Sequence, residues 1–154
     1  MPVTITMERP DTADALLLIS ELDALLEPLY PHESRHGLSV EQLLDEAVVF
    51  FLLRVYGTPA ACGGIKLLGA EYGEIKRMYV RPHFRGRGFA KSILNHLTGY
   101  ARGRDVGLLR LETGIHQSEA IGLYERVGFQ RIPPFGAYAE DPLSLFYELR
   151  LGWA

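Results

Sequence analysis

Apolar residues recur along the 154-residue chain with two periods, and these periods divide it into predicted strands and helices. A spacing of three and four, which gives a helix one apolar face, runs through 15–29, 88–102 and 118–127, and a short helix is predicted over 39–46. Alternating, β-branched or aromatic runs are typical of strands and cover 3–7, 48–56, 60–68, 72–80, 108–113, 129–132 and 143–151. The predicted order is βα(α)βββαβαββ.

This order predicts an α+β fold built on a mixed, mostly antiparallel sheet flanked by helices. Gly57-Thr58-Pro59 joins two strands in the manner of a hairpin, and a third strand follows closely. The later strand-helix-strand unit predicts a crossover in the middle of the sheet. A chain of this length buries one sizeable core and is short for two ordinary domains, so we expect a single domain over 1–154.

The net charge of the chain is small, but one segment is locally basic. The net charge is −3 and the pI is near 5.9, so the composition offers no general attraction to nucleic acid or to an anionic membrane, and neither is expected as a partner. Between Met78 and Arg104, however, six Lys and Arg residues occur without any Asp or Glu. A local basic patch of this kind suits a compact anion.

The cysteine count and the N-terminus bear on the compartment. The single cysteine, Cys62, fits a reducing environment and is expected to pack as a small hydrophobe rather than to act as a nucleophile. The stretch MPVTITMERPD lacks a secretory signal pattern, and no apolar run approaches the roughly 18 residues that span a bilayer. We therefore expect a cytoplasmic protein. No metal site is predicted, and a homodimer stays an open alternative.

The segment RPHFRGRGFAKS, residues 81–92, lies where a predicted strand gives way to a helix. The first N–H groups of a helix lack intrahelical partners and carry the positive end of its dipole, which attracts phosphate. Gly86 and Gly88 would let an anion approach the backbone. Neither a Walker loop nor a dinucleotide fingerprint fits the spacing, and a plain glycine turn on a solvated basic face is the alternative. The cations around this turn are Arg81, Arg85, Arg87 and Lys91.

Taken as Arg85-x-x-Gly88-x-Ala90, the turn resembles the coenzyme A pyrophosphate site of the GNAT superfamily of acetyl-CoA-dependent N-acetyltransferases. GEIKRMYV is similar to the splayed central strand of that family, and EAIGLYERVGF is similar to its terminal motif. The resemblance implies a three-layer fold, acetyl-CoA as co-substrate and no metal. It assigns to coenzyme A the residues Met78, Tyr79, Val80, Arg85, Gly86, Arg87, Gly88, Phe89, Ala90, Lys91 and Gln117, the last where many members carry Asn.

Three further segments, PHESRHGLS, LETG and IPPFGAYAEDPLSLFYEL, resemble a bacterial subgroup named as indole-acetate acetyltransferases. Nothing in these residues selects that substrate.

Acetyl transfer to an amine needs a base, an oxyanion donor and a proton for the departing thiolate. A lysine-like amine is almost entirely protonated at pH 7. Glu74 stands where family members with a catalytic glutamate carry it, and a surface carboxylate opposite Lys76 or Arg77 is the alternative. The backbone N–H of Met78 is the expected oxyanion donor. Tyr124, in the terminal motif, is expected to protonate the thiolate, and a plain core role is its alternative.

Together these features predict an enzyme that acetylates a primary amine of a small molecule, amino acid or peptide by direct attack in a ternary complex. The expected acceptor contacts come from the loops PHESRHGLS and PPFGAYAEDP. They are His32, Glu33, His36 and Tyr138. For the first three, a solvated loop with no acceptor contact is the alternative. A CoA-binding sensor that has lost the transfer step is the alternative from another functional class.

The segment His32-Glu33-Ser34-Arg35-His36 also matches H-E-x-x-H, the helical zinc motif of metallopeptidases. Pro31 and Gly37 bracket it within a turn-rich connection, and no third ligand is evident. A zinc peptidase is therefore a remote alternative.

Overall fold

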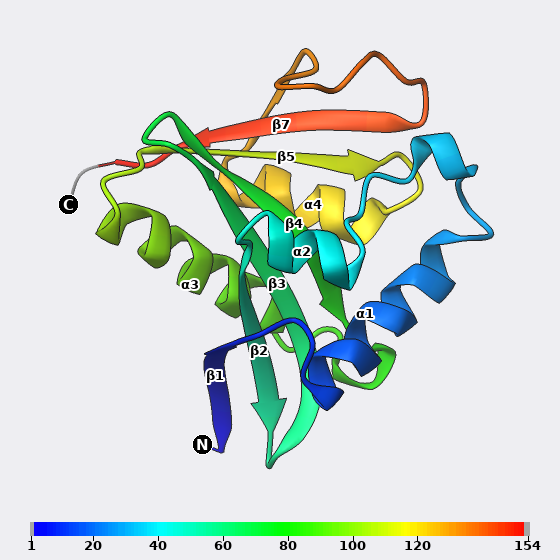
Figure 1. Cartoon of the computed structure of the whole chain (residues 1–154), viewed down its shortest axis with the longest axis vertical. Coiled ribbons are helices and arrows are strands. Elements are labelled where there is room, and N and C mark those ends of the chain that lie inside the picture. The colour runs from blue at the N-terminus through cyan, green and yellow to red at the C-terminus, as the bar shows by residue number, and fades with distance from the viewer. Residues whose placement is uncertain (1, 153–154) are drawn as a thin grey trace.

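A seven-stranded mixed sheet organises residues 2–152, the part of the chain that the computed structural model describes (Figure 1). The strands are β1 (Val3–Glu8), β2 (Val49–Val55), β3 (Thr58–Leu68), β4 (Tyr72–Val80), β5 (Leu108–Gly114), β6 (Gln130–Ile132) and β7 (Ser144–Arg150). Their order across the sheet is β1-β2-β3-β4-β5-β7-β6. Neighbouring strands are antiparallel except β4 and β5, which run parallel. The predicted α+β class and the mostly antiparallel sheet are confirmed.

Several helix ends carry an identifiable cap. The helices are α1 (Ala13–Leu26), α2 (Val40–Asp45), α3 (Phe89–Gly103) and α4 (Ser118–Val127), with single 3-10 turns η1 (His32–Ser34) and η2 (Pro82–Phe84). The Thr12 side chain accepts a hydrogen bond from the N–H of Ala15 and caps α1. Ser39 and Gln42 form a capping box at the start of α2. Gly128, with φ of 113°, ends α4 in the left-handed conformation that glycine favours.

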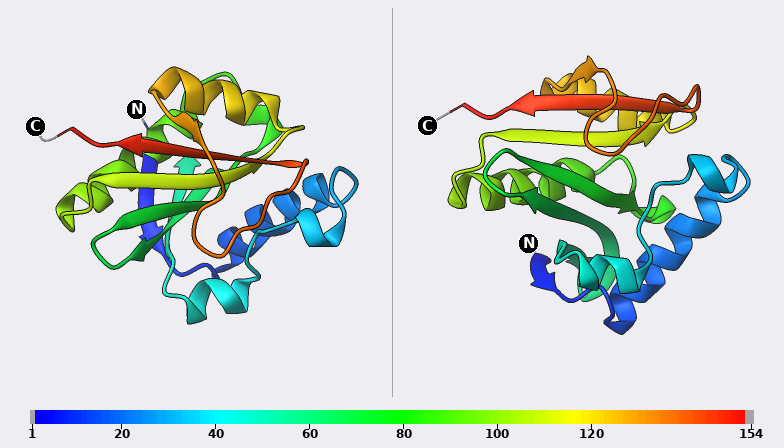
Figure 2. Two further views of the ribbon diagram at one scale, coloured as in Figure 1. Left: turned by 90° about the horizontal axis from the view of Figure 1, so that it is seen from above. Right: turned by 45° about the horizontal axis from the view of Figure 1, so that its top comes forward.

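Side chains from both faces of the sheet are buried. Phe51 and Leu53 of β2 belong to the core that includes α3, whereas Phe50 and Leu52 belong to the core that includes α1 and α2. This alternation follows the two-residue period of a strand. Figure 2 shows α3 and α4 on one face of the sheet and α1 and α2 on the other, which gives three layers. Within residues 2–152, no helix is long and apolar enough to cross a membrane.

The two parallel strands diverge in the middle of the sheet. Their residue pairs are Gly73 with Leu109 and Glu74 with Arg110, and beyond these β4 and β5 continue without pairing (Figure 1). A shift in the β3–β4 register falls between Cys62 and Gly64. Opposite it, Arg77 has φ of 58°, a left-handed conformation that bends β4. Divergence and bend together leave room between β4 and β5 for a cavity.

Candidate active site

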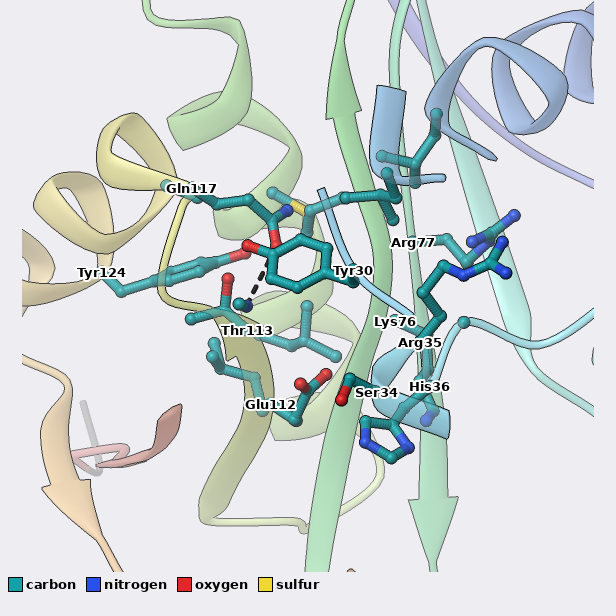
Figure 3. Close-up of a pocket in the computed structure, with 18 of the residues that line it drawn as sticks. Tyr30, Ser34, Arg35, His36, Lys76, Arg77, Glu112, Thr113, Gln117 and Tyr124 are labelled. Carbon is teal, nitrogen blue, oxygen red and sulfur yellow. Dashed lines mark hydrogen bonds between the residues drawn. The ribbon is translucent and has the colours of Figure 1, made fainter. Parts of the chain in front are cut away.

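A cavity of about 90 Å³ opens where β4 and β5 diverge (Figure 3). Since one water molecule needs roughly 10–15 Å³ on this measure, a small substrate group fits inside. The wall is formed by β4 and β5, by α1 and α4, and by the loops that contain residues 30–37 and Tyr138. Residues from distant parts of the chain therefore surround the unpaired ends of β4 and β5.

Glu112 of β5 and Tyr124 of α4 both line this cavity. Burial raises the pKa of the Glu112 carboxyl, although the Ser144 hydroxyl donates a 2.8 Å hydrogen bond that favours the ionised form. Tyr124 is buried, and burial together with the charge of Glu112 raises the pKa of its phenol. At neutral pH the phenol therefore stays protonated. A carboxylate poised to accept a proton thus faces the same space as a phenol that keeps one.

Glu74, the base expected from the sequence, lies in a different setting. Its carboxylate is buried, forms an ion pair with Lys76 at 2.9 Å and accepts a 2.5 Å hydrogen bond from the Tyr138 hydroxyl. Lys76 in turn donates to the Tyr138 oxygen at 2.8 Å. Lys76 and Tyr138 belong to the described wall of the cavity, whereas Glu74 does not. The pairing with Lys76 agrees with the alternative drawn from the sequence, but the carboxylate is buried rather than at the surface.

The glycine-rich turn leads from β4 through η2 into α3. Gly86 and Gly88 both have φ of 78°, and a Cβ added to either would meet nothing within 4 Å. Gly88 is the N-cap residue of α3, so Phe89, Ala90 and Lys91 form its first turn. Arg85 donates to the Val80 carbonyl at 3.1 Å. The turn is therefore anchored to the end of β4 and presents an open, glycine-lined helix N-terminus that suits an anion.

One of the four cations expected around this turn has a structural role instead. Arg81 forms an ion pair with Glu21 at 3.1 Å and donates to the Pro59 carbonyl at 3.1 Å. The Arg87 guanidinium lies over the Phe84 ring, 5.6 Å from its centroid. Arg85, Arg87 and Lys91 are exposed, so these three side chains are available to a bound anion.

Of the other residues assigned to coenzyme A, Met78 and Gln117 line the cavity, whereas Tyr79 belongs to the core beside α1. Met78 follows the bend in β4 and lines the cavity, and Gly63 leaves space for its sulfur. The Tyr79 hydroxyl donates to Glu21 at 3.0 Å, which turns its ring toward α1. Gln117 lines the cavity, and its side-chain oxygen accepts a 3.0 Å hydrogen bond from the Gly114 N–H.

Comparison with known proteins agrees with this geometry. Residues 18–129 match the model of the acetyltransferase (GNAT) family. The chain belongs to the GNAT acetyltransferase family. It is 42% identical over 147 residues to a protein named IAA acetyltransferase from Azospirillum brasilense, covering 95% of this chain and 96% of that protein. The family and its members identify the protein as an acyl-CoA N-acyltransferase.

Solved structures of other GNAT proteins share the fold. A Klebsiella pneumoniae protein assigned as an acyl-CoA N-acyltransferase superposes with a TM-score of 0.83 at 39% identity, over 97% of this chain and 98% of that one. A GNAT acetyltransferase from Elizabethkingia anophelis, solved with acetyl-CoA bound, superposes with a TM-score of 0.72 at 18% identity, over 97% and 99% of the two chains. The likeness to the second protein shows the fold alone.

The HESRH segment is not helical in the way the zinc motif requires. His32, Glu33 and Ser34 form the 3-10 turn η1, and Arg35 is extended, so the two histidines do not share a face of an α-helix. Within residues 2–152, no group of three His, Cys, Asp or Glu side chains is arranged to hold a metal ion. His36 lines the GNAT cavity edge-on to Tyr138, whereas His32 and Glu33 are exposed outside it.

The site predicted from the sequence did not include Glu112 and Tyr30, which both line the cavity. Glu112 occupies a polar position in LETG between buried Leu111 and Thr113, and a carboxylate in an inner strand is a signal that could have been used. Tyr30 accepts a 2.9 Å hydrogen bond from the His116 N–H and packs on Gly114, which has no side chain to block it. Tyr30 lies in the loop after α1, far in sequence from Gly114 of β5, so no local sequence pattern indicates this contact.

Proposed function

We propose that the protein transfers the acetyl group of acetyl-CoA to a primary amine of a small molecule. The observation that carries this proposal is the shared cavity of Glu112 and Tyr124 beside the divergent strands. Membership of the GNAT family supports the acetyl donor, as does the relative with bound acetyl-CoA. The name of the Azospirillum relative supports a small-molecule acceptor without identifying it.

The coenzyme would lie along the turn and the end of β4. Arg85, Arg87 and Lys91 would neutralise its phosphates, and the glycines Gly86 and Gly88 would let the phosphates reach the N–H groups of α3. Met78 and Gln117 would contact the pantetheine arm where it enters the cavity. Acetyl-CoA bound in this way would supply the thioester carbonyl that the amine attacks.

Glu112 is the base that fits this arrangement best. Its carboxylate would accept a proton from the amine as the amine nitrogen bonds to the carbonyl carbon, because burial has already made proton uptake easier. Glu74 is less suited, since Lys76 and Tyr138 both contact its Oε2 and it does not line the cavity. The backbone N–H of Met78 is our candidate donor to the oxyanion.

Tyr124 would act on the departing sulfur. As the carbon–sulfur bond breaks, the electron pair stays on sulfur, and the Tyr124 hydroxyl donates a proton to it. Burial raises the pKa of the phenol, and the same dry surroundings disfavour a bare thiolate. Proton transfer from the phenol would therefore avoid leaving an unsolvated thiolate in the cavity.

The test is an acetyl-CoA consumption screen over amino acids, polyamines, aminoglycosides and peptide N-termini. We expect release of the CoA thiol to depend on an added amine and an N-acetyl product of matching mass. Tight CoA binding with no amine-dependent release across the panel would overturn the proposal and favour the sensor alternative.

A further inference from the structure

A second phenol, that of Tyr30, lines the cavity together with Tyr124. Both tyrosines belong to its wall, and both are buried. Tyr124 comes from α4, whereas Tyr30 comes from the loop after α1. In Figure 3 the two side chains enter from opposite sides, with their hydroxyl ends toward one another. The proposed transfer uses the hydroxyl of Tyr124 and leaves that of Tyr30 without a role.

The Tyr30 ring is held in place by contacts with the end of β5 and the start of α4. Its oxygen accepts a 2.9 Å hydrogen bond from the His116 N–H, and its ring centroid lies 5.5 Å from that of the His116 ring. A Cβ at Gly114 would collide with the phenol oxygen, so this position admits the phenol only because it is a glycine. The hydroxyl is thus fixed on the part of β5 that no longer pairs with β4.

The O–H of Tyr30 is available to a ligand. A phenol donates one hydrogen bond and can also accept. Within residues 2–152, the Tyr30 oxygen accepts from His116, and its own O–H donates to no side chain or carbonyl. Tyr30 is only 6% exposed, so bulk water reaches little of it. Because buried donors are normally paired, this unpaired O–H at the cavity indicates a partner that binds there.

The surroundings of Tyr30 keep the proton on its oxygen. Burial raises the pKa of the phenol, the His116 N–H acts in the opposite direction, and the charge of Glu112 raises the pKa further. At neutral pH the hydroxyl is therefore a donor. Because it also accepts a hydrogen bond, its O–H is polarised and becomes a stronger donor. Glu112 acts in the same way on the phenol of Tyr124, so both hydroxyls lie near this carboxylate.

The position of Tyr30 suits the departing sulfur rather than the carbonyl oxygen. The candidate oxyanion donor, the Met78 N–H, belongs to β4, whereas the hydroxyl of Tyr30 is bound between β5 and α4, on the side of Tyr124. Gln117, the proposed pantetheine contact, binds the N–H of Gly114, the residue against which Tyr30 packs. A pantetheine arm that contacts Gln117 would therefore carry its sulfur to the two phenols.

We propose that Tyr30 is a further catalytic residue, whose hydroxyl donates a hydrogen bond to the sulfur of CoA as the carbon–sulfur bond breaks. The electron pair of that bond stays on sulfur, Tyr124 supplies the proton, and the proton of Tyr30 stays on its own oxygen. A hydrogen bond to an anion is stronger than one to a neutral group, so Tyr30 stabilises the transition state more than the bound thioester. This inference rests on the proposed acetyl transfer and adds a second hydroxyl on its leaving-group side.

Tyr30→Phe tests the inference in turnover, because it keeps the ring and removes the hydroxyl. We expect kcat to fall about ten- to a hundredfold, the range of one hydrogen bond to a charged group, with the KM for acetyl-CoA within about twofold. Tyr147→Phe is the matched control. The Tyr147 hydroxyl lies outside the cavity wall and donates a 2.8 Å hydrogen bond to Glu125, which joins β7 to α4. This control loses a structural hydrogen bond and should keep the wild-type kcat.

The pKa of the bound CoA thiol separates a contact with sulfur from a purely structural role, and its measurement needs no amine. The thiolate is followed by its ultraviolet absorbance as the pH rises, and the complex with desulfo-CoA, which lacks the sulfur, corrects for ionising tyrosines. Loss of a donor to the thiolate should raise the thiol pKa in Tyr30→Phe by about one unit. Glu112 and Tyr124 are present in both proteins, so the difference reports Tyr30. Tyr147→Phe should match the wild type.

Tyr30→3-fluorotyrosine tests the same contact in a variant that keeps the ring and the hydroxyl. Its phenol is more acidic, so it donates more strongly and accepts more weakly. A contact with sulfur predicts a lower pKa of the bound thiol, whereas a hydroxyl that only accepts from His116 leaves this pKa unchanged.

Each outcome decides a separate point. Wild-type kcat in folded Tyr30→Phe overturns the inference. A lower kcat with an unchanged thiol pKa in both variants overturns the contact with sulfur and leaves Tyr30 as a structural link between the loop after α1 and the start of α4. Failure to acetylate any amine overturns the proposed function, and the thiol pKa then still shows whether Tyr30 contacts the sulfur.

Discussion

Glu74 and Glu112 are both carboxylates on central strands, yet their surroundings give them different properties. Lys76 and Tyr138 both contact Oε2 of Glu74, outside the cavity wall, whereas Glu112 lines the cavity and accepts one hydrogen bond from Ser144. The sequence predicts that a glutamate is needed. It cannot tell which one lines the cavity, because Tyr138 is 64 residues from Glu74 and Ser144 is 32 residues from Glu112, and only the folded chain brings them together.

The Ser144 hydroxyl is expected to set the acid limit of activity. Its hydrogen bond is the largest influence that lowers the pKa of Glu112 against the effect of burial. Ser144→Ala removes that influence, so the pKa rises and the base is protonated up to a higher pH. We expect the acid limb of the kcat/KM profile to move upward by about one pH unit.

Ser20→Ala is the control for this profile, because the Ser20 hydroxyl is exposed on α1 and donates to the Leu17 carbonyl. An unchanged acid limb in folded Ser144→Ala, measured on the same amine, would show that Glu112 does not govern it.

At the scale of elements, sequence patterns predicted most of the secondary structure. The spacing of apolar residues predicted α1, α3 and α4, although α1 ends at Leu26 because Pro28 cannot donate the next helical hydrogen bond. The same patterns do not predict the order of strands in the sheet, because β7 lies between β5 and β6 through long-range pairing. The bend at Arg77 was also hidden, because arginine is not a residue that signals a positive φ.

The glycine turn gives a prediction at this scale. Gly88→Ala places a Cβ in the open space where phosphate would bind, so the Kd for CoA should rise at least about tenfold. Gly57→Ala is a closely matched control, since Gly57 in the β2–β3 hairpin also has φ of 78° and nothing within 4 Å. Both variants should lose about 1 kcal/mol of stability through backbone strain.

Calorimetric titration with CoA and thermal melts separate the two effects. Equal CoA affinities for the two variants would remove the turn from the phosphate site, whatever their stabilities.

At the scale of the whole molecule, the cavity exists because loops far apart in sequence are fastened together. Ser34 donates a 2.6 Å hydrogen bond to Asp141, joining the loop after α1 to the loop before β7. Tyr30 holds the start of α4 through the His116 N–H. The sequence indicated that both loops shape the acceptor site, but it could not show how they meet. Their contact decides which side chains line the wall.

Coenzyme binding should stabilise the whole domain. At a CoA concentration of 100 times Kd, the gain is about 2.7 kcal/mol, which corresponds to a rise in Tm of roughly 5–10 °C for a chain of this size. Differential scanning fluorimetry with and without CoA measures it. Gly88→Ala should show a smaller rise at the same concentration, and an unchanged Tm for the wild type would argue against a CoA site.

The most direct test of the account is the rate of N-acetyl product formation by Glu112→Gln, Tyr124→Phe and Glu74→Gln on one acetylated amine. We predict that the first two lower kcat by about a hundredfold or more, the usual contribution of a general base or acid, with little change in the KM for acetyl-CoA. Glu74→Gln should retain far more activity than either. Wild-type kcat in Glu112→Gln, together with loss of activity in folded Glu74→Gln, would contradict the account.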